Sequence, residues 1–186
     1  MTEDQAVMRC QHGERDAFRY LVERYQDIVF GTAYNMTRNR ALAEELAQEA
    51  FLSAWKGIRS FRRGRPFKPW LMRILVNAVM AHRRRRSVET TPIEGSELEG
   101  EGDAESPEDL AESRSEQQDS QRAIGELSPD HRQVVVLRYY GDMTVPEVAQ
   151  ASGLAEGTVK SRLHRAHRAL RQQLAGAAVA EVRDER

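Results

Sequence analysis

The chain of 186 residues is poor in cysteine and in long apolar runs, and each shortage excludes a class of protein. Cys10 is the only cysteine, so no disulfide can form within the chain and a reducing compartment is expected. No apolar run approaches the roughly 18 residues of a membrane span. The first residues also lack the basic and then apolar pattern of a secretion signal. We therefore expect a cytoplasmic protein.

The sequence also lacks the motifs that mark catalytic and metal sites. It contains no phosphate-binding glycine loop and no nucleophile elbow around a serine. His164 and His167 lie three residues apart, but no third ligand accompanies them, which argues against a metal site. We expect no enzymatic activity, no cofactor, no bound metal and no small-molecule substrate.

Charge is nearly balanced over the whole chain but is distributed unevenly along it. Residues 1–86 carry 17 Lys and Arg against 9 Asp and Glu, and residues 122–186 carry 10 against 8. Residues 87–121 carry 1 against 12 and have few apolar side chains. This composition predicts disorder, and both a passive tether and a mimic of nucleic acid fit it. Two basic modules joined by an acidic segment are typical of nucleic-acid binding.

The periodicity of apolar residues predicts an all-α fold built from two small helical modules. The first module covers residues 1–86 and the second covers 122–175, with a flexible acidic linker over 87–121 and a tail over 176–186. Thr2 and Gln5 form a capping box for a short helix that ends near Gly13, and a second helix is expected from about Glu14 to Asn35.

The stretch AEELAQEAFLSAW predicts a third helix with an acidic face. Its buried stripe consists of Leu42, Leu46, Ala50, Ala54 and Ile58, with Phe51 and Trp55 widening it. The side chains off this stripe are Glu44, Glu45, Gln48, Glu49 and Leu52. They form either a solvated face or a protein-binding face, and the exposed Leu52 favours the second because partner surfaces combine charge with an apolar anchor.

A basic loop with aromatic residues, Ser60–Lys68, follows this helix. Cations neutralise phosphates, and aromatic or guanidinium planes stack on unpaired bases. Pro69 fits the first turn of a further helix that ends in four arginines, and this is more positive charge than a helix dipole requires. Asn77 is unusual inside that helix. It makes either a structural hydrogen bond or a contact with a base edge.

The second module has the spacing of a helix-turn-helix motif. A helix is expected over about 122–127, Ser128-Pro129 starts another that runs through Tyr139, and Thr144 to Glu147 is a capping box. The motif itself consists of Val148, Ala149, Gly153, Leu154 and Val159. Its second helix is expected to bury Val159, Leu163, Ala166 and Leu170 and to expose Lys160, Ser161, His164, Arg165 and Arg168. A helical hairpin without a nucleic-acid role is the alternative.

Three motifs in this order resemble an extracytoplasmic-function (ECF) RNA polymerase sigma factor. They are AEELAQEAFLSAW, then FKPWLMRILVN with its arginine end, and LSPDHRQVVVLRYYGDMTVPEVAQASGLAEGTVKSRLHRAHRALR. The resemblance covers about Asp16 to Leu174 apart from the linker. It implies that the first module is sigma region 2 and the last is sigma region 4.

The resemblance also implies the partners and the site residues. The partners are core RNA polymerase, through the clamp helices of its largest subunit and its beta flap, promoter DNA, and an anti-sigma factor. The residues expected on the clamp helices are Glu45, Gln48, Glu49 and Leu52. Those expected at the minus-10 element are Phe61, Arg62, Arg63, Arg65, Phe67, Trp70, Asn77, Arg83 and Arg84. Those expected at the minus-35 element are Thr158, Lys160, Ser161, Arg162, His164 and Arg165.

Two positions depart from the family pattern, and two rival functions stay open. Ala81 stands where the family often has an aspartate, and His164 occupies a variable reading position. A stand-alone helix-turn-helix regulator that binds duplex without polymerase would leave the basic loop and the acidic helix unexplained. A structural or RNA-binding adaptor would leave the helix-turn-helix spacing unexplained.

Overall fold

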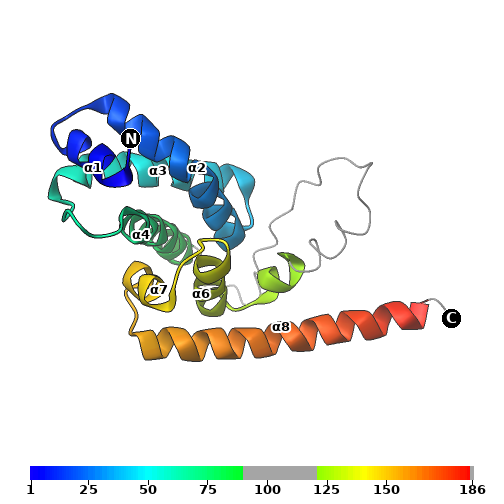
Figure 1. Ribbon diagram of the computed structural model, residues 1–186. Helices are drawn as coiled ribbons and strands as arrows, with labels where there is room; N and C mark the ends of the chain where they lie inside the picture. Colours follow the sequence, from blue (N-terminus) through cyan, green and yellow to red (C-terminus); the bar gives the residue numbers. More distant parts are fainter. Residues whose placement is uncertain (90–120, 185–186) are drawn as a thin grey trace.

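The computed structural model describes residues 1–89 and 121–184, which form helices and no strand (Figure 1), as expected for an all-α fold. The predicted acidic linker lies outside the described residues except at its two ends. None of the described helices combines the length and the apolar character that crossing a membrane requires. In chain order the elements are α1 (Glu3–Gln11), α2 (Arg15–Thr37), α3 (Arg40–Gly57), the short 3-10 helix η1 (Ile58–Ser60), α4 (Phe67–Glu89), a helical turn over 121–126, α6 (Pro129–Tyr139), α7 (Val145–Ser152) and α8 (Glu156–Asp184).

Local capping groups begin the helices where the sequence predicts. The Thr2 and Thr144 capping boxes are both formed, and Ser128 accepts a hydrogen bond from the backbone of His131. Asn39, which the sequence reasoning did not single out, caps α3 by accepting a hydrogen bond from the backbone of Leu42 at 2.9 Å. Side-chain oxygens at these positions satisfy backbone N–H groups that have no partner within the helix.

Two helix boundaries differ from the prediction. α4 begins at Phe67, so Lys68 belongs to the helix and the loop before it is shorter than expected. α8 continues to Asp184, through most of the segment that the sequence analysis set apart as a tail. Proline explains the first difference, because Pro69 is accepted anywhere in the first turn and so does not mark the first helical residue.

The first module packs α1 to α4 around an apolar core. Leu21 of α2, Leu46 of α3 and Leu71 of α4 are each at most 1% exposed. Phe18 of α2 contacts the rings of Phe51 and Trp55 on α3, with ring centroids 6.5 and 5.1 Å apart. The partly buried aromatic residues thus join α2 to α3, as the predicted widening of the α3 stripe requires.

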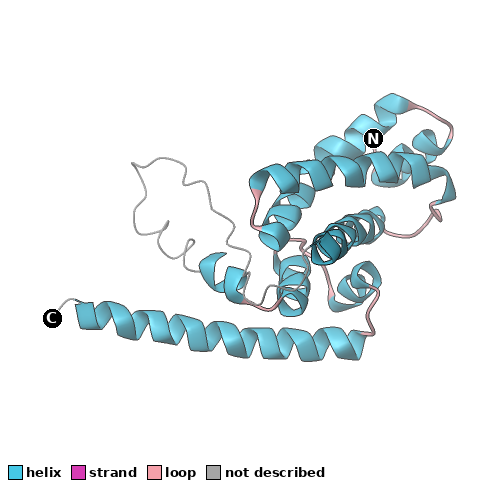
Figure 2. Cartoon of the chain, turned by 180° about the vertical axis from the view of Figure 1, so that it is seen from behind, coloured by secondary structure: helices cyan, strands magenta, loops and turns pink. Residues whose placement is uncertain are grey.

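The second module is folded against the first. α7 lies against α4 and α6 lies against α2, so that one continuous core runs through both modules (Figures 1 and 2). The Nζ atom of Lys68 is 3.6 Å from a carboxylate oxygen of Asp142, and an Nη atom of Arg73 donates to the backbone oxygen of Gln150 at 3.2 Å. The sequence predicted two modules and a linker, but nothing in its local patterns indicated this contact.

Candidate nucleic-acid interface

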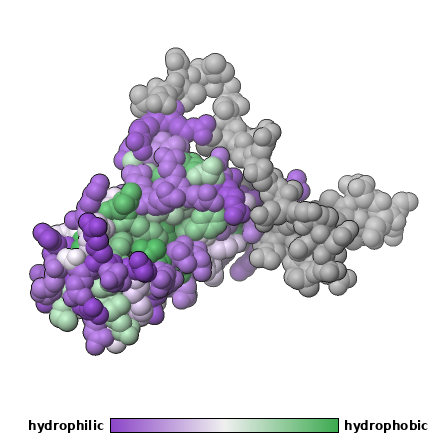
Figure 3. Space-filling model, turned by 90° about the horizontal axis from the view of Figure 1, so that it is seen from above, coloured by the Kyte–Doolittle hydropathy of each residue, from purple (hydrophilic) through white to green (hydrophobic). Residues whose placement is uncertain are grey.

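The acidic face of α3 is exposed, and the apolar stripe behind it is buried. Leu46, Ala50, Ala54 and Ile58 are at most 1% exposed, whereas Leu42 is only partly buried. Glu45, Gln48, Glu49 and Leu52 all face solvent, and Leu52 is 61% exposed although it is a large apolar residue. Figure 3, which looks onto the side of α1–α3, shows an apolar area bordered by hydrophilic side chains. The combination of acidic side chains with the exposed Leu52 on α3 is suited to a protein partner.

Phe61 and Phe67, the aromatic residues of the basic loop, are buried in this structure, whereas stacking on bases would need exposed rings. Phe61 is 7% exposed and Phe67 is 1% exposed. Their ring centroids are 5.7 Å apart, and Trp70 lies within 5.4 Å of both rings. Tyr25 completes this cluster at 5.8 Å from Phe67. Burial in the core of the module outweighs presentation to solvent because each ring removes a large apolar area from water.

The cations of the same loop are exposed, as the sequence predicts for phosphate contacts. Arg62, Arg63 and Arg65 face solvent, and Gly64 adopts a φ of +75°, which lets the loop turn between them. Lys68 instead points to Asp142 of the second module. The loop therefore presents three guanidinium groups on a backbone anchored by buried aromatic rings.

Asn77 lies on the exposed side of α4, in the third turn after the loop. Within the described part of the chain its amide has no hydrogen-bond partner, and its side chain faces solvent. Arg83 and Arg84 are exposed further along the same helix. Arg73, four residues before Asn77 and so on the same side of α4, contacts the second module. The surface around Asn77 thus borders the contact between the modules.

The helix-turn-helix motif forms as predicted in α7 and α8. Val148 and Val159 are fully buried where the two helices cross, and Gly153 ends α7 with a left-handed φ of +72°. Val159, Leu163 and Ala166 are buried as expected, whereas Leu170 is only partly buried. The exposed face of α8 carries Lys160, Ser161, His164, Arg165 and Arg168. Thr158, expected beside them, is partly buried.

Arg162 differs from the other residues expected at the minus-35 element. Its Nη2 atom donates to a carboxylate oxygen of Asp130 at 2.8 Å, and its side chain is 23% exposed. This ion pair joins α8 to the first turn of α6. Arg162 therefore links α8 to α6, and its side chain is less exposed than those of the neighbouring reading-face residues.

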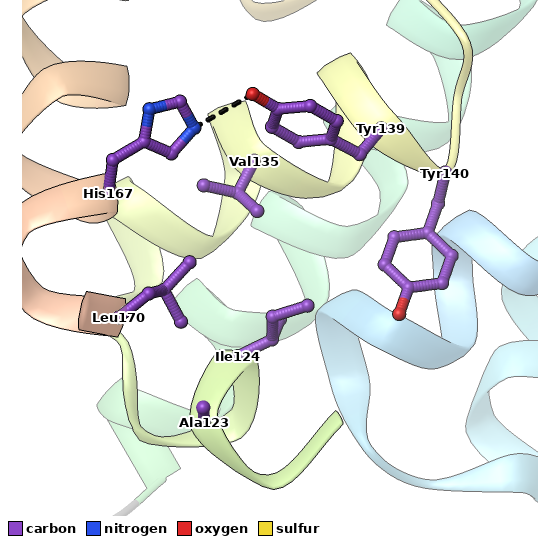
Figure 4. Close-up of a pocket in the computed structure, with 7 residues that line it drawn as sticks. All are labelled: Ala123, Ile124, Val135, Tyr139, Tyr140, His167 and Leu170. Atoms are coloured by element: carbon purple, nitrogen blue, oxygen red, sulfur yellow. Dashed lines mark hydrogen bonds between the residues drawn. The ribbon is translucent and has the colours of Figure 1, made fainter. Parts of the chain in front are cut away.

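A hollow of about 390 Å³ lies between the helical turn at 121–126, α6 and α8 (Figure 4). Its lining consists of Ala123, Ile124, Val135, Tyr139, Tyr140, His167 and Leu170. The Tyr139 hydroxyl and the Nε2 atom of His167 are hydrogen-bonded at 2.8 Å. His167 therefore has a tyrosine partner, while His164 faces solvent. No local pattern in the sequence indicates this hollow, because its lining residues come from three separate segments.

Family models match both modules of the chain. The model of Sigma-70 region 2 matches residues 21–88, and that of Sigma-70 region 4 matches residues 118–170. Among curated proteins, the ECF RNA polymerase sigma factor SigW of Bacillus subtilis is 33% identical over 176 residues, covering 90% of this chain and 94% of that protein. The ECF RNA polymerase sigma-E factor of Escherichia coli K12 is 33% identical over 178 residues, covering 91% and 93%.

Two solved structures have a similar fold. CnrH in complex with the cytosolic domain of CnrY superposes with a TM-score of 0.70, at 24% identity over 94% of this chain and 97% of that one. The sigma factor RpoE of Bartonella quintana, in complex with the anti-sigma factor NepR, superposes with a TM-score of 0.66 at 26% identity, over 85% and 96%.

Proposed function

The chain belongs to the ECF sigma factors, the promoter-recognising subunits of bacterial RNA polymerase, and from this premise we propose which of its surfaces performs each step. One observation carries the assignment. The acidic face of α3, the basic loop with Asn77, and the basic face of α8 are three separate exposed surfaces, each with the chemistry that one partner needs.

The acidic face of α3 docks on the clamp helices of the largest polymerase subunit. Glu45, Gln48 and Glu49 supply charge and hydrogen bonds, while Leu52 supplies an apolar anchor that loses its exposed surface on binding. Complementary charge around a central apolar residue provides both orientation and affinity.

The basic loop and Asn77 stabilise the opened minus-10 element. Unpairing and extruding a base costs a few kcal/mol, which contacts to the free base must offset. Asn77 offers an amide to the base edge, and Arg62, Arg63 and Arg65 neutralise phosphates or stack on a base with their guanidinium planes. Phe61, Phe67 and Trp70 support the loop from behind through their ring cluster. Arg83 and Arg84 extend the phosphate contacts along α4.

The exposed face of α8 reads the minus-35 element in the major groove. Residues near the start of the second helix of such a motif reach base edges. Lys160, Ser161, His164 and Arg165, which are exposed, supply hydrogen-bonding groups for base edges and phosphates, and Thr158 contacts the DNA backbone. Polymerase supplies the chemistry of transcription, so we expect no enzymatic activity from this chain itself, and we expect it in the cytoplasm with the polymerase.

The two modules must separate before both promoter elements can be bound. The element names place them about 25 base pairs apart, which is roughly 85 Å along a duplex at 34–36 Å per turn. A module of this size has a radius of gyration of only roughly 10 Å, and α7 lies directly against α4. Burial first, and then the nearby guanidinium groups of Arg38 and Arg83, lower the pKa of Arg132 where the modules meet. The repulsion between Arg132 and these two guanidinium groups weakens the closed arrangement of the two modules and favours their separation when the chain binds polymerase.

Two further contacts complete the proposal. The hollow lined by Tyr139, His167 and Leu170 is an apolar site on region 4 for the beta flap of polymerase. An anti-sigma factor is proposed as the inhibitor of the chain. The similar fold of the Bartonella quintana sigma factor, which was solved in complex with an anti-sigma factor, supports this assignment.

Runoff transcription on a library of genomic fragments tests the function. Core polymerase with this chain is expected to initiate at a small set of sites, and core polymerase alone is expected to initiate at none of them. Initiation that does not depend on the chain would contradict the proposal. Tight protection of palindromic duplex by the chain alone would support the rival, a stand-alone helix-turn-helix regulator.

A further inference from the structure

The last residue of α1, Gln11, uses all parts of its side-chain amide to bond η1 and the basic loop that follows it. Its Nε2 atom donates to the backbone oxygens of Ile58 at 3.0 Å and Phe61 at 2.8 Å. Its Oε1 atom accepts a hydrogen bond from the Nε atom of Arg63 at 2.7 Å. One side chain thus uses both of its donors and its acceptor on a segment about fifty residues further along the chain.

The first residue of α1, Glu3, holds the other end of the same loop. Its Oε1 atom accepts a hydrogen bond from the backbone N–H of Phe67 at 3.2 Å. Phe67 is the first residue of α4, and its N–H is one of the groups that a helix cannot satisfy internally. The Oε2 atom of Glu3 accepts a hydrogen bond from the Tyr25 hydroxyl, which fixes the carboxylate against α2.

The loop between these two anchors has little hydrogen bonding of its own. The backbone N–H of Phe61 donates to the oxygen of Ile58 at 3.1 Å, and that of Arg65 donates to the oxygen of Arg62 at 3.4 Å, which is long. Ordering a free loop costs backbone entropy at every residue. The contacts from α1 therefore fix much of the conformation in which the three exposed guanidinium groups are presented.

We propose that Gln11 and Glu3 are positioning residues, which hold the loop over 61–66 in the conformation that receives an extruded base. Gln11 also directs Arg63, because the bond to its Nε atom restrains the plane of the guanidinium group. The inference rests on the proposed role of the loop in minus-10 capture. Binding to a pre-formed site avoids the cost of ordering the site during the reaction. Loss of either anchor would slow promoter opening without removing any group that touches DNA.

Two substitutions at Gln11 separate its bond to Arg63 from its bonds to the backbone oxygens. Gln11→Met keeps the length of the side chain and removes all three hydrogen bonds. Gln11→Glu keeps the acceptor for Arg63 but removes both donors to the backbone oxygens of Ile58 and Phe61. Met8→Gln, an exposed position on the same helix, is the matched control.

The assay uses full-length chain with core polymerase on a promoter found by runoff transcription, with 2-aminopurine in the minus-10 element. Gln11→Met is expected to slow strand opening by about ten-fold. It is also expected to lose discrimination between the natural minus-10 element and one with a substituted base. Gln11→Glu is expected to slow opening less, and Met8→Gln is expected to behave as the unmodified chain. Core-polymerase affinity and minus-35 duplex affinity stay unchanged in all three, while Gln11→Met lowers the melting temperature by a few degrees because it removes three hydrogen bonds.

Two results would overturn the inference. In the first, Gln11→Met opens the promoter at the normal rate and with normal discrimination. In the second, its opening rate, core-polymerase affinity and melting temperature fall in parallel, which is the behaviour of a purely structural residue. Asn77→Ala is measured beside it to separate this inference from the proposed function. If Asn77→Ala blocks promoter opening and Gln11→Met does not, only the positioning role of Gln11 and Glu3 is wrong. Normal opening in both variants would overturn the proposed minus-10 site as well.

Discussion

Arg162 of α8 is paired with Asp130 of α6 over 2.8 Å, while Arg165, three residues further along α8, is exposed. The two arginines belong to the same helix and differ in what they contact. One joins two helices of region 4, and the other belongs to the face proposed to read the minus-35 element. A substitution of each is expected to affect a different measurable property.

Arg165→Ala is expected to weaken minus-35 duplex binding by about 1–3 kcal/mol if the guanidinium contacts a base edge. Arg162→Ala removes a partly exposed ion pair and is expected to lower the free energy of unfolding by at most about 1 kcal/mol. Duplex affinity by fluorescence anisotropy and thermal unfolding by circular dichroism, measured on both variants, test the distinction. Equal losses of duplex affinity in the two variants would show that Arg162 also contacts the minus-35 element.

Reversing the charge of the acidic face of α3 is expected to weaken polymerase binding. The double variant Glu45→Lys, Glu49→Lys should lose affinity for core polymerase by about ten-fold or more, because complementary charge at an interface is replaced by like charge. Its binding to minus-35 duplex should not fall. The variant Glu23→Lys, Asp27→Lys, which reverses the same charge on exposed positions of α2, is the control. Equal retention of both variants on immobilised core polymerase would remove the docking role.

Asn77→Ala is expected to impair opening and to spare upstream recognition. A base-edge contact of a side-chain amide is worth about 1–3 kcal/mol, so strand opening should slow by roughly ten-fold or more. Permanganate reactivity of the minus-10 thymines measures the opened fraction. A template with a pre-melted minus-10 element should reduce the deficit, because base unpairing is then no longer needed. Equal loss of duplex binding and opening would contradict the assignment.

Weakening the contact between the modules is expected to favour the open chain. The variant Arg73→Met, Asp142→Asn removes the bond to Gln150 and the charge opposite Lys68. Each is a partly exposed interaction worth up to about 1 kcal/mol, so opening of the promoter should accelerate by roughly five-fold. Small-angle scattering should show a larger radius of gyration. Arg19→Met with Asp27→Asn on α2 is the control, and an unchanged radius would show that these bonds do not hold the modules together.

Cys10 is expected to be unreactive in the folded chain. It is 1% exposed, and burial raises the pKa of its thiol to about 11. Because the thiolate is the reactive form, a maleimide should not label the native chain at pH 8 but should label it in denaturant. The raised pKa also makes the free energy of unfolding depend on pH, because the thiol of the unfolded chain ionises at a lower pH than the buried thiol. Stability should therefore fall as the pH rises from about 9 towards 11. Rapid labelling of the native chain would show that the thiol is accessible.

The sequence alone determined where the helices lie, apart from the start of α4 and the length of α8, and it determined the exposed faces of α3 and α8, apart from Thr158 and Arg162. Thr2, Ser128 and the Thr144 capping box form hydrogen bonds across only three residues of the chain, so their effect can be predicted from the local sequence. The spacing of apolar residues in α3 and α8 placed Glu45 and Arg165 on exposed faces for the same reason, since helical periodicity relates neighbours in sequence to neighbours in space.

The tertiary structure decided three matters that no local pattern contains. Phe61 and Phe67 are buried because Trp70 and Tyr25 fold over them, and an aromatic residue in a loop is equally compatible with a core or with a contact surface. Gln11 meets the basic loop, and Lys68 meets Asp142, across large separations in sequence. Contacts of this kind depend on how packed helices place distant segments. They are selected by the burial and hydrogen bonding of the whole chain rather than by the residues beside them.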